Sequence, residues 1–311
     1  VIVSNFDLVN VIDPTLRPSS ERDPSQLQTV IINASHGGKD AGISGPFGVE
    51  KNFTLDLALR LKKQLADTPY RIVLTREGDF DLSIADRFAL AESVKGEAIF
   101  VSLHLGNGNP NARGLEISTL PPPYTPATYD PVDAEPDTSF YPGNINDRES
   151  LALAVAIQGQ ALRQKLRALG LKRSRYEELK GIDIPAVYCR AGFITNKEDV
   201  KLLRQPEHLD EIAKVLAGGI KRYASEMEEG IEQYTLRRAQ DPLIISKIEV
   251  FPDQVRSLQG EKRRVRFDIR AHESTEIDPA KVDVQVYFFD IVNGKTLDLS
   301  AADPPAVEWI S

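Results

Sequence analysis

Short apolar runs alternate with longer amphipathic segments from about residue 27 to residue 229. The apolar runs have the length of strands, and several of the segments between them place leucines at helical spacing. Strands that alternate with helices along a chain form an α/β structure, because each helix returns the chain to begin the next strand in parallel. The alternation therefore predicts one α/β domain built on a mainly parallel sheet.

Several elements can be placed from their own patterns. The run at 27–35 predicts a buried strand, and a glycine-rich loop leads from it into a helix over about 50–66. Ser83 is a suitable N-cap for the next helix. The segment from 148 onward is amphipathic as far as Gly170, which predicts one long helix ended by that glycine.

The character of the sequence changes towards both ends. Residues 1–26 are polar and contain prolines, which predicts an N-terminal extension. Near the other end, apolar and alternating runs are separated by turn signals such as "QGEK" and "NGK", a pattern typical of a small all-β unit. We therefore expect an α/β domain at 27–235 and a β-sandwich-like domain at 236–311, whose strands are few for a complete sandwich.

The composition excludes several classes of function. A net charge of −8 and a pI near 5.2 give no basic footprint for nucleic acid. No apolar run reaches the length of about 18 residues that a membrane-spanning helix needs. The single cysteine, Cys189, excludes an intrachain disulfide and a cysteine-based zinc site, and strand alternation predicts that it packs into the core.

Three residues of metal-binding type stand at the ends of predicted elements. His36 follows the first strand, His104 ends the third, and Glu50 opens the first helix. Ligands of open α/β sheets bind beyond the carboxyl ends of the strands, and two histidines with one carboxylate form the ligand set of a catalytic zinc ion. Spacing alone leaves an alternative, in which the histidines are hydrogen-bonded loop residues and Glu50 favours its helix N-terminus.

Five stretches in a fixed order resemble a known family: "SHGGKDAGISGPFGVEKNFTLDLALRL", "IVLTREGDFDLSIADRFALAE", "IFVSLHLGNGNPNARGLEI", "ESLALAVAIQ" and "IPAVYCRAGFITNKEDVKLL". Over about residues 27–225 the chain closely resembles the zinc-dependent N-acetylmuramoyl-L-alanine amidases of the bacterial cell wall. The specific motifs include the His-Gly-Gly loop, the Glu-Lys helix start, the Ser-x-His strand end and the Gly-Phe-Ile-Thr-Asn turn. The resemblance implies a mixed, mostly parallel sheet with helices on both faces.

The resemblance also implies a metal and a substrate. The zinc ligands of the family fall on His36, Glu50 and His104. Zinc lowers the pKa of a bound water and polarises a carbonyl, so the implied reaction is metal-assisted hydrolysis. The implied substrate is peptidoglycan, or muropeptides, at the amide between N-acetylmuramic acid and L-alanine. The implied location is the bacterial cell envelope, periplasmic or secreted, although no signal peptide is visible in this chain.

The sequence departs from the family at one catalytic position. In "IPAVYCRAGFITN", Arg190 replaces the glutamate that serves the family as general base and then as proton donor. Arginine stays protonated and accepts no proton, and loss of a general acid–base group costs about 10²- to 10⁴-fold in rate. Arg190 either binds an anionic group of the substrate or forms a structural ion pair with Glu50 or Glu116. Glu177 or Glu178, just upstream, is a candidate replacement for the base.

Two main functions are compatible with this combination, and a weaker third is a related peptidase that acts on a different amide. The first is a zinc amidase that acts on peptidoglycan, slowed by Arg190. The second is a degenerate amidase that holds cell-wall fragments or a partner protein without cleaving. The complete set of metal-binding residues favours the enzyme, whereas Arg190 favours the binding protein. A protein partner that contacts the C-terminal β domain is compatible with either function.

Overall fold

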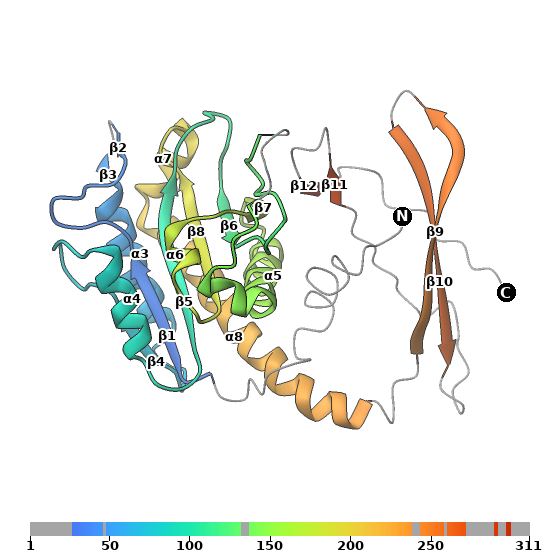
Figure 1. The fold of residues 1–311 in the computed structure, drawn as a ribbon. Coiled ribbons are helices and arrows are strands. Elements are labelled where there is room, and N and C mark those ends of the chain that lie inside the picture. The colour runs from blue at the N-terminus through green and yellow to red at the C-terminus, as the bar shows by residue number, and fades with distance from the viewer. Residues whose placement is uncertain are drawn as a thin grey trace.

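The structure is a computed structural model that describes residues 27–45, 48–131, 137–237, 243–257, 260–271, 289–291 and 297–299. Its centre is a six-stranded sheet in the order β4-β1-β5-β8-β6-β7 (Figure 1). The strands are β1 (Thr29–Ala34), β4 (Arg71–Leu74), β5 (Ala98–Gly106), β6 (Leu115–Thr119), β7 (Ala168–Arg173) and β8 (Ala186–Phe193). All neighbouring pairs are parallel except β6 and β8, which are antiparallel. The predicted mixed, mostly parallel sheet is confirmed.

Helices cover both faces of the sheet, as predicted. The helices are α3 (Glu50–Gln64), α4 (Ile84–Ser93), η2 (Pro142–Asn146), α5 (Asp147–Arg163), α6 (Glu177–Lys180), α7 (Lys197–Leu203) and α8 (Pro206–Arg237). Apolar side chains of α3, α5 and α8 pack with alternate sheet residues such as Val30 and Val101 into the larger core. Those of α4 and α6 pack with the intervening residues, such as Ile31 and Phe100, into a smaller core on the other face. Burial on both faces explains why the strand sequences are continuous apolar runs.

The first helices begin as their sequences predict. A two-stranded hairpin of β2 (Ser44–Gly45) and β3 (Gly48–Val49) leads directly into α3, whose first residue is Glu50. Ser83 caps α4 in a reciprocal capping box with Asp86, which confirms the predicted N-cap. Thus α3 places a carboxylate at its first position, beside the carboxyl ends of β1 and β5.

The prediction of one long helix from residue 148 to Gly170 is wrong. Helix α5 ends at Arg163, and Lys165 follows with a left-handed φ of 56° that stops the helix. Residues Ala168–Arg173 then form β7, which pairs in parallel with β6 and extends the sheet by one strand. The amphipathic pattern runs through this boundary because Leu166, Ala168 and Leu171 also pack against the larger core, and pairing with β6 overrides helix propensity.

Much of the sequence near the two ends of the chain lies outside the residues that the structure describes. The predicted extension at 1–26 lies outside the described residues. In the C-terminal part, β9 (Leu243–Ser257) pairs antiparallel with β10 (Gly260–Ala271), and β11 (Phe289–Ile291) with β12 (Leu297–Leu299). A sandwich-like domain at 236–311 stays a prediction, because much of that segment lies outside the described residues. Among the helices that the structure describes, none is both long and apolar enough to cross a membrane.

Candidate metal centre

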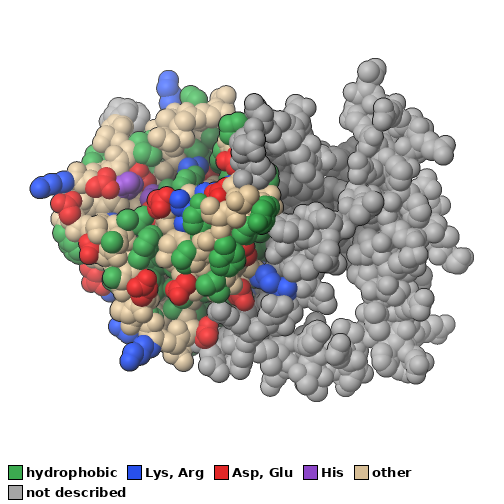
Figure 2. All heavy atoms as spheres, in the orientation of Figure 1, with side chains coloured by type: hydrophobic (Ala, Val, Ile, Leu, Met, Phe, Trp, Pro, Cys, Tyr) green, Lys and Arg blue, Asp and Glu red, His purple; other side chains and the backbone are tan. Residues whose placement is uncertain are grey.

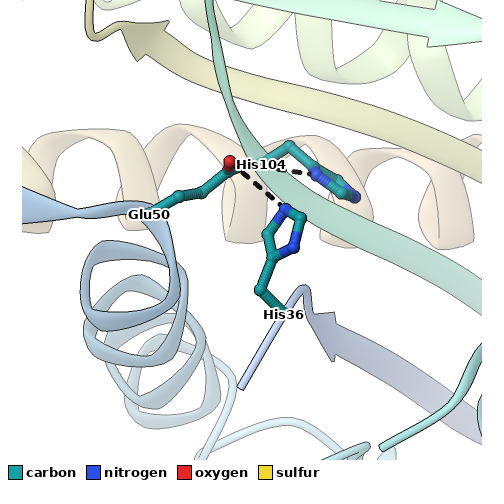
Figure 3. Close-up of side chains that lie close together, drawn as sticks. All are labelled: His36, Glu50 and His104. Atoms are coloured by element: carbon teal, nitrogen blue, oxygen red, sulfur yellow. Dashed lines mark hydrogen bonds and ion pairs between the residues drawn. The ribbon is translucent and has the colours of Figure 1, made fainter. Parts of the chain in front are cut away.

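Three side chains from separate elements converge beyond the carboxyl ends of β1 and β5 (Figure 3). His36 lies two residues after β1, Glu50 opens α3, and His104 lies near the end of β5. Oε2 of Glu50 is 3.2 Å from Nε2 of His36, and Oε1 of Glu50 is 3.2 Å from Nδ1 of His104. The structure thus brings together all three residues that the sequence singled out.

The donor atoms of this cluster fit a small divalent ion. One donor atom from each side chain can be chosen so that all three lie within 4.8 Å of one another. Nitrogen and oxygen ligands about 2.0–2.1 Å from a tetrahedral zinc ion lie about 3.3 Å from each other. Each imidazole nitrogen here lies 3.2 Å from its nearer oxygen of Glu50, a similar separation. Two imidazoles and one carboxylate also match the ligand preferences of zinc.

Glu50 is held as a buried carboxylate. Its side chain is 1% exposed, and it accepts hydrogen bonds from the amides of Ile43 at 3.0 Å and Leu105 at 2.8 Å. Burial disfavours the charged form, but the hydrogen bonds from His104, His36 and Ile43 outweigh it and hold the pKa of Glu50 far below its ordinary value. The centre therefore holds a negative charge ready for a cation.

The loop that carries His36 has an unusual backbone. His36 adopts a left-handed φ of 60°, which is uncommon for a residue with a side chain, and Gly38 also has a left-handed φ of 56°. Asp40 accepts a hydrogen bond from Nδ1 of His36 at 2.8 Å, and this leaves Nε2 facing Glu50. Burial lowers the pKa of His36, but Glu50 and Asp40 raise it by more, so the net shift is upward.

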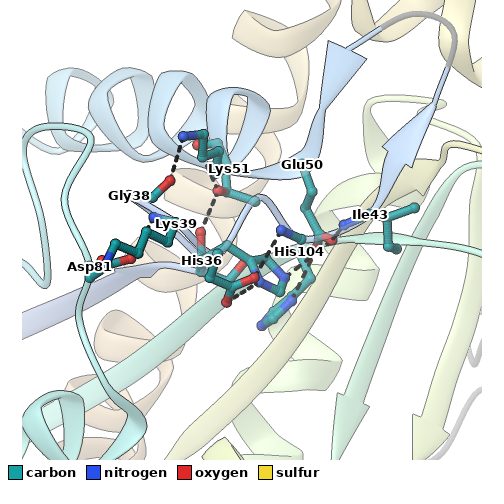
Figure 4. A network of polar contacts seen from close by, with 12 residues as sticks. His36, Gly38, Lys39, Ile43, Glu50, Lys51, Asp81 and His104 are labelled. Atoms are coloured by element: carbon teal, nitrogen blue, oxygen red, sulfur yellow. Dashed lines mark hydrogen bonds and ion pairs between the residues drawn. The ribbon is translucent and has the colours of Figure 1, made fainter.

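Charged side chains tie this loop to its neighbours (Figure 4). The Lys51 ammonium donates to the carbonyl of Gly38 at 2.7 Å, and the amide of Lys39 donates to Asp81 at 2.6 Å. In the space-filling view, histidine reaches the surface among acidic and basic side chains (Figure 2). The strained turn is thus fixed from both sides, which keeps the imidazole of His36 directed at Glu50.

Two buried arginines donate hydrogen bonds to the backbone of the same loop and its neighbours. Arg87 donates to the carbonyl of His36 at 2.9 Å. Arg76 is 1% exposed and donates to the carbonyls of Ala34, Ser35, Lys51 and Gly78 at 2.7–3.0 Å. Burial lowers the pKa of both guanidinium groups. Because five fixed donors satisfy several carbonyls at once, a single ammonium cannot replace the guanidinium of Arg76.

We expect Arg76→Lys to lower the free energy of unfolding by about 3 kcal/mol, because buried carbonyls lose their donors. Urea denaturation followed by circular dichroism measures this change. Arg71→Lys is the matched control, since Arg71 is exposed at the start of β4 and its replacement should stay within about 0.5 kcal/mol. Equal stability of the two variants would contradict the role given to Arg76.

His104 is held on its ring face as well as at its nitrogens. Its ring stacks on Tyr188 with a centroid separation of 4.0 Å, and Tyr188 stacks on Tyr176 at the same separation. Nε2 of His104 lies 3.1 Å from Oε1 of Glu178 in α6. Two stacked rings and two carboxylates therefore fix this imidazole in one orientation.

Arg190 lies beside His104 in the sheet, but its guanidinium binds other residues. In the sheet Arg190 pairs with His104 of β5 on one side and with Glu116 of β6 on the other. Its Nη1 binds Oε1 of Glu116 at 2.7 Å, and its Nη2 contacts the hydroxyl of Tyr176. Of the two ion pairs predicted for Arg190, the structure shows the one with Glu116, whereas Glu50 keeps to the histidines.

Glu116, the ion-pair partner of Arg190, is fully buried. Its side chain is 0% exposed, and its second oxygen accepts a hydrogen bond from the hydroxyl of Tyr129 at 2.5 Å. Tyr129 belongs to the proline-rich segment after β6, which Arg175 anchors through Asp130 at 3.1 Å and Asp137 at 3.0 Å. The guanidinium of Arg190 is thus neutralised by a buried carboxylate rather than directed at the candidate metal centre.

The two glutamates considered as replacements for the missing base lie in different surroundings. Glu177 is 68% exposed and pairs with Lys180 at 2.5 Å, without a described contact to the three residues of the candidate metal centre. Glu178 is largely buried and contacts His104. Burial raises the pKa of Glu178, but the hydrogen bond from His104 lowers it by more, so the carboxylate form is favoured. Of the two, only Glu178 reaches the centre.

Some residues of the centre could not be found from the sequence. Asp40 stands four residues after His36, a spacing that offered a weak signal. Tyr176 stacks on Tyr188, which stacks on His104, and no sequence pattern marks this arrangement. Glu178 was a sequence candidate, but as a base and not as a partner of His104. Cys189 is fully buried on the opposite face of β8, as strand alternation predicted, and burial raises the pKa of its thiol to about 12.

Comparison with known proteins gives a consistent result. The family model described as "N-acetylmuramoyl-L-alanine amidase" matches residues 30–222. The probable cell wall amidase LytH of Staphylococcus epidermidis is 29% identical over 213 residues, which cover 67% of this chain and 62% of that protein. The chain therefore spans less than two thirds of this curated relative.

Solved structures with the same fold were also found. The catalytic domain of CwlV, an N-acetylmuramoyl-L-alanine amidase from Bacillus (Paenibacillus) polymyxa var. colistinus, is 25% identical with a TM-score of 0.52. The alignment covers 64% of this chain and 99% of that domain. The N-acetylmuramoyl-L-alanine amidase AmiC2 of Nostoc punctiforme is 27% identical with a TM-score of 0.52, over 64% of this chain and 97% of that structure.

Proposed function

Because this chain belongs to the N-acetylmuramoyl-L-alanine amidase family, whose model matches residues 30–222, we propose that it hydrolyses the amide between N-acetylmuramic acid and L-alanine in peptidoglycan. The observation that carries the proposal is the cluster of His36, Glu50 and His104, which offers one donor atom from each side chain within 4.8 Å of the others. These three residues would hold a zinc ion. The proposed location is the bacterial cell envelope, where the proposed substrate occurs.

Each part of the centre has a chemical task in this proposal. Zinc supplies Lewis acidity towards the amide carbonyl and lowers the pKa of water. Glu50 provides the anionic ligand, and the Asp40 carboxylate fixes which nitrogen of His36 faces the metal position. The backbone of the His36 loop is held by Arg76, Arg87 and Lys51, so the site is preorganised before any ligand binds.

Arg190 sets the expected speed of the reaction. Its guanidinium accepts no proton, and its ion pair with buried Glu116 leaves it neutralised. We therefore propose a slow amidase, about 10²- to 10⁴-fold below one with a carboxylate at this position. The same ion pair favours the second candidate, a degenerate amidase that binds muropeptides or a protein partner without cleaving them.

The deciding experiment compares metal content with product release. The purified chain is loaded with zinc, its metal content is measured, and it is incubated with purified sacculi while free stem peptides are followed by mass spectrometry. We expect about one zinc per chain, as a single three-ligand cluster requires, and a slow release of peptides that chelation abolishes. Zinc binding without any release over long incubation would overturn the amidase in favour of the binding protein.

A further inference from the structure

The ring of His104 has a carboxylate at each of its two nitrogens. Nδ1 lies 3.2 Å from Oε1 of Glu50, and Nε2 lies 3.1 Å from Oε1 of Glu178. A neutral imidazole carries one proton, so one nitrogen donates and the other is left with a lone pair. The two carboxylates are therefore not equivalent partners: one accepts the ring proton, and the other lies beside the nitrogen that is free to bind a metal.

His36 offers the same choice and shows how the chain resolves it. Its Nδ1 lies 2.8 Å from Asp40, which is not part of the three-residue cluster, and its Nε2 lies 3.2 Å from Glu50. Glu50 is thus the carboxylate common to both histidines, and each ring has a second carboxylate at its far nitrogen. Metal-binding histidines commonly donate their other N–H to such a carboxylate, which fixes the tautomer and makes the ligand more basic.

From this geometry we infer that Glu178 is a positioning residue, which accepts the Nε2 proton of His104 and thereby makes Nδ1 the metal-binding nitrogen. The inference rests on the proposed metal site. It gives Glu178, which the sequence offered as a substitute base, the role of orienting His104. The two histidines would then bind through different atoms, His36 through Nε2 and His104 through Nδ1.

The position of Glu178 suits the orientation of the His104 ring better than it suits proton transfer to a substrate. Its carboxylate contacts Nε2 of the His104 ring, whereas Nδ1 faces Glu50, the carboxylate that also contacts His36. A general base has to reach the proton it removes, directly or through one water. A carboxylate already engaged with the imidazole is well placed to orient the ring instead.

The turn that presents Glu178 is firmly packed. Leu179 is 1% exposed in the smaller core, and Tyr176 stacks on Tyr188, which stacks on His104. Gly143 of η2 lies so close that a Cβ atom there would stand 1.9 Å from the carbonyl oxygen of Leu179. Such close packing restricts the carboxylate to one position, which a tautomer-setting residue requires.

Nitrogen NMR tests the inference directly, since the chain has four histidines. The ¹⁵N-labelled chain is loaded with ¹¹³Cd, and long-range proton–nitrogen spectra identify the protonated and the metal-coupled nitrogen of each ring. We expect cadmium coupling to Nε2 of His36 and to Nδ1 of His104, with a proton on Nε2 of His104. Coupling of cadmium to Nε2 of His104 would overturn the inference.

Three variants separate positioning from base catalysis through zinc affinity. Glu178→Ala should weaken zinc binding about 10- to 100-fold, because an outer carboxylate is lost. Glu178→Gln keeps an acceptor oxygen for the Nε2 proton and should stay within about 3-fold of the unmodified chain by the same argument. Glu177→Ala removes the exposed neighbouring carboxylate and should leave zinc affinity unchanged.

A different pattern would identify a base. Unchanged zinc affinity in all three variants, with peptide release lowered about 10²- to 10⁴-fold in Glu178→Gln, contradicts the positioning role. The cadmium spectrum of the unmodified chain decides the matter even if a variant fails to fold. If the expected couplings are found but sacculi are never cleaved, the inference stands and only the proposed amidase activity fails.

Discussion

We expect Glu50→Gln to abolish stoichiometric zinc binding and, with it, any release of stem peptides. Among the residues that the structure describes, Glu50 is the carboxylate that faces both histidines, and it is the anionic member of the three proposed ligands. The amide keeps the size of the side chain and an oxygen for the Leu105 N–H, but it removes the charge and the acceptor of the Ile43 N–H. The loss of affinity should exceed the ~10- to 100-fold that loss of an outer carboxylate costs.

Zinc titration against a competing chelator measures this loss, and circular dichroism checks that the fold is kept. Glu92→Gln serves as the control, because Glu92 is an exposed carboxylate of α4, remote from the cluster in its contacts, and its loss changes the net charge equally. Unaltered zinc affinity in Glu50→Gln would show that the metal, if bound, lies elsewhere, and the proposed centre would have to be abandoned.

Arg190→Glu should raise the rate of peptide release about 10²- to 10⁴-fold, the range expected when a general acid–base group is supplied. In the sheet the new carboxylate would stand between His104 and Glu116. Two neighbouring carboxylates share a proton, because both cannot readily ionise side by side. The new carboxylate would then be placed to accept a proton and to return it.

The same substitution should lower stability. Glu116 is 0% exposed and loses its 2.7 Å ion pair, so the free energy of unfolding should fall by about 3–5 kcal/mol. Arg190→Gln is the matched control, because it removes the same ion pair but supplies no base. We expect it to be destabilised without a gain in rate. A variant Arg190→Glu that folds, binds zinc and is no faster than Arg190→Gln would show that this position has lost its connection to the reaction.

The sequence predicted the fold where its pattern depended on burial alone. The β1 and β5 strands are buried on both faces, so their continuous apolar runs were unambiguous. The boundary between α5 and β7 was missed, because the left-handed turn at Lys165 leaves no mark in hydrophobic periodicity. Only pairing with β6 makes Ala168–Arg173 a strand, and that partner is distant in sequence.

The candidate metal centre was also predictable from the sequence only in part. His36, Glu50 and His104 were singled out because each lies at an element end whose position the fold dictates. The contact between His104 and Glu178 joins residues 74 apart, and the packing of α6 decides it. Likewise, the motif register identified the position of Arg190, but the antiparallel pairing of β6 and β8 selects Glu116 over Glu50 as its partner.

The burial of Cys189 has a practical consequence for following motion in this molecule. The chain contains one cysteine, and its thiol is fully buried with a pKa raised to about 12, so it hardly reacts with maleimides or iodoacetamides at neutral pH. A cysteine introduced at Thr125, in the proline-rich segment that Arg175 anchors, would then be the only reactive thiol of an otherwise native chain. A spin label or fluorophore attached there could report how this segment moves when cell-wall fragments bind, without removal of the native residue.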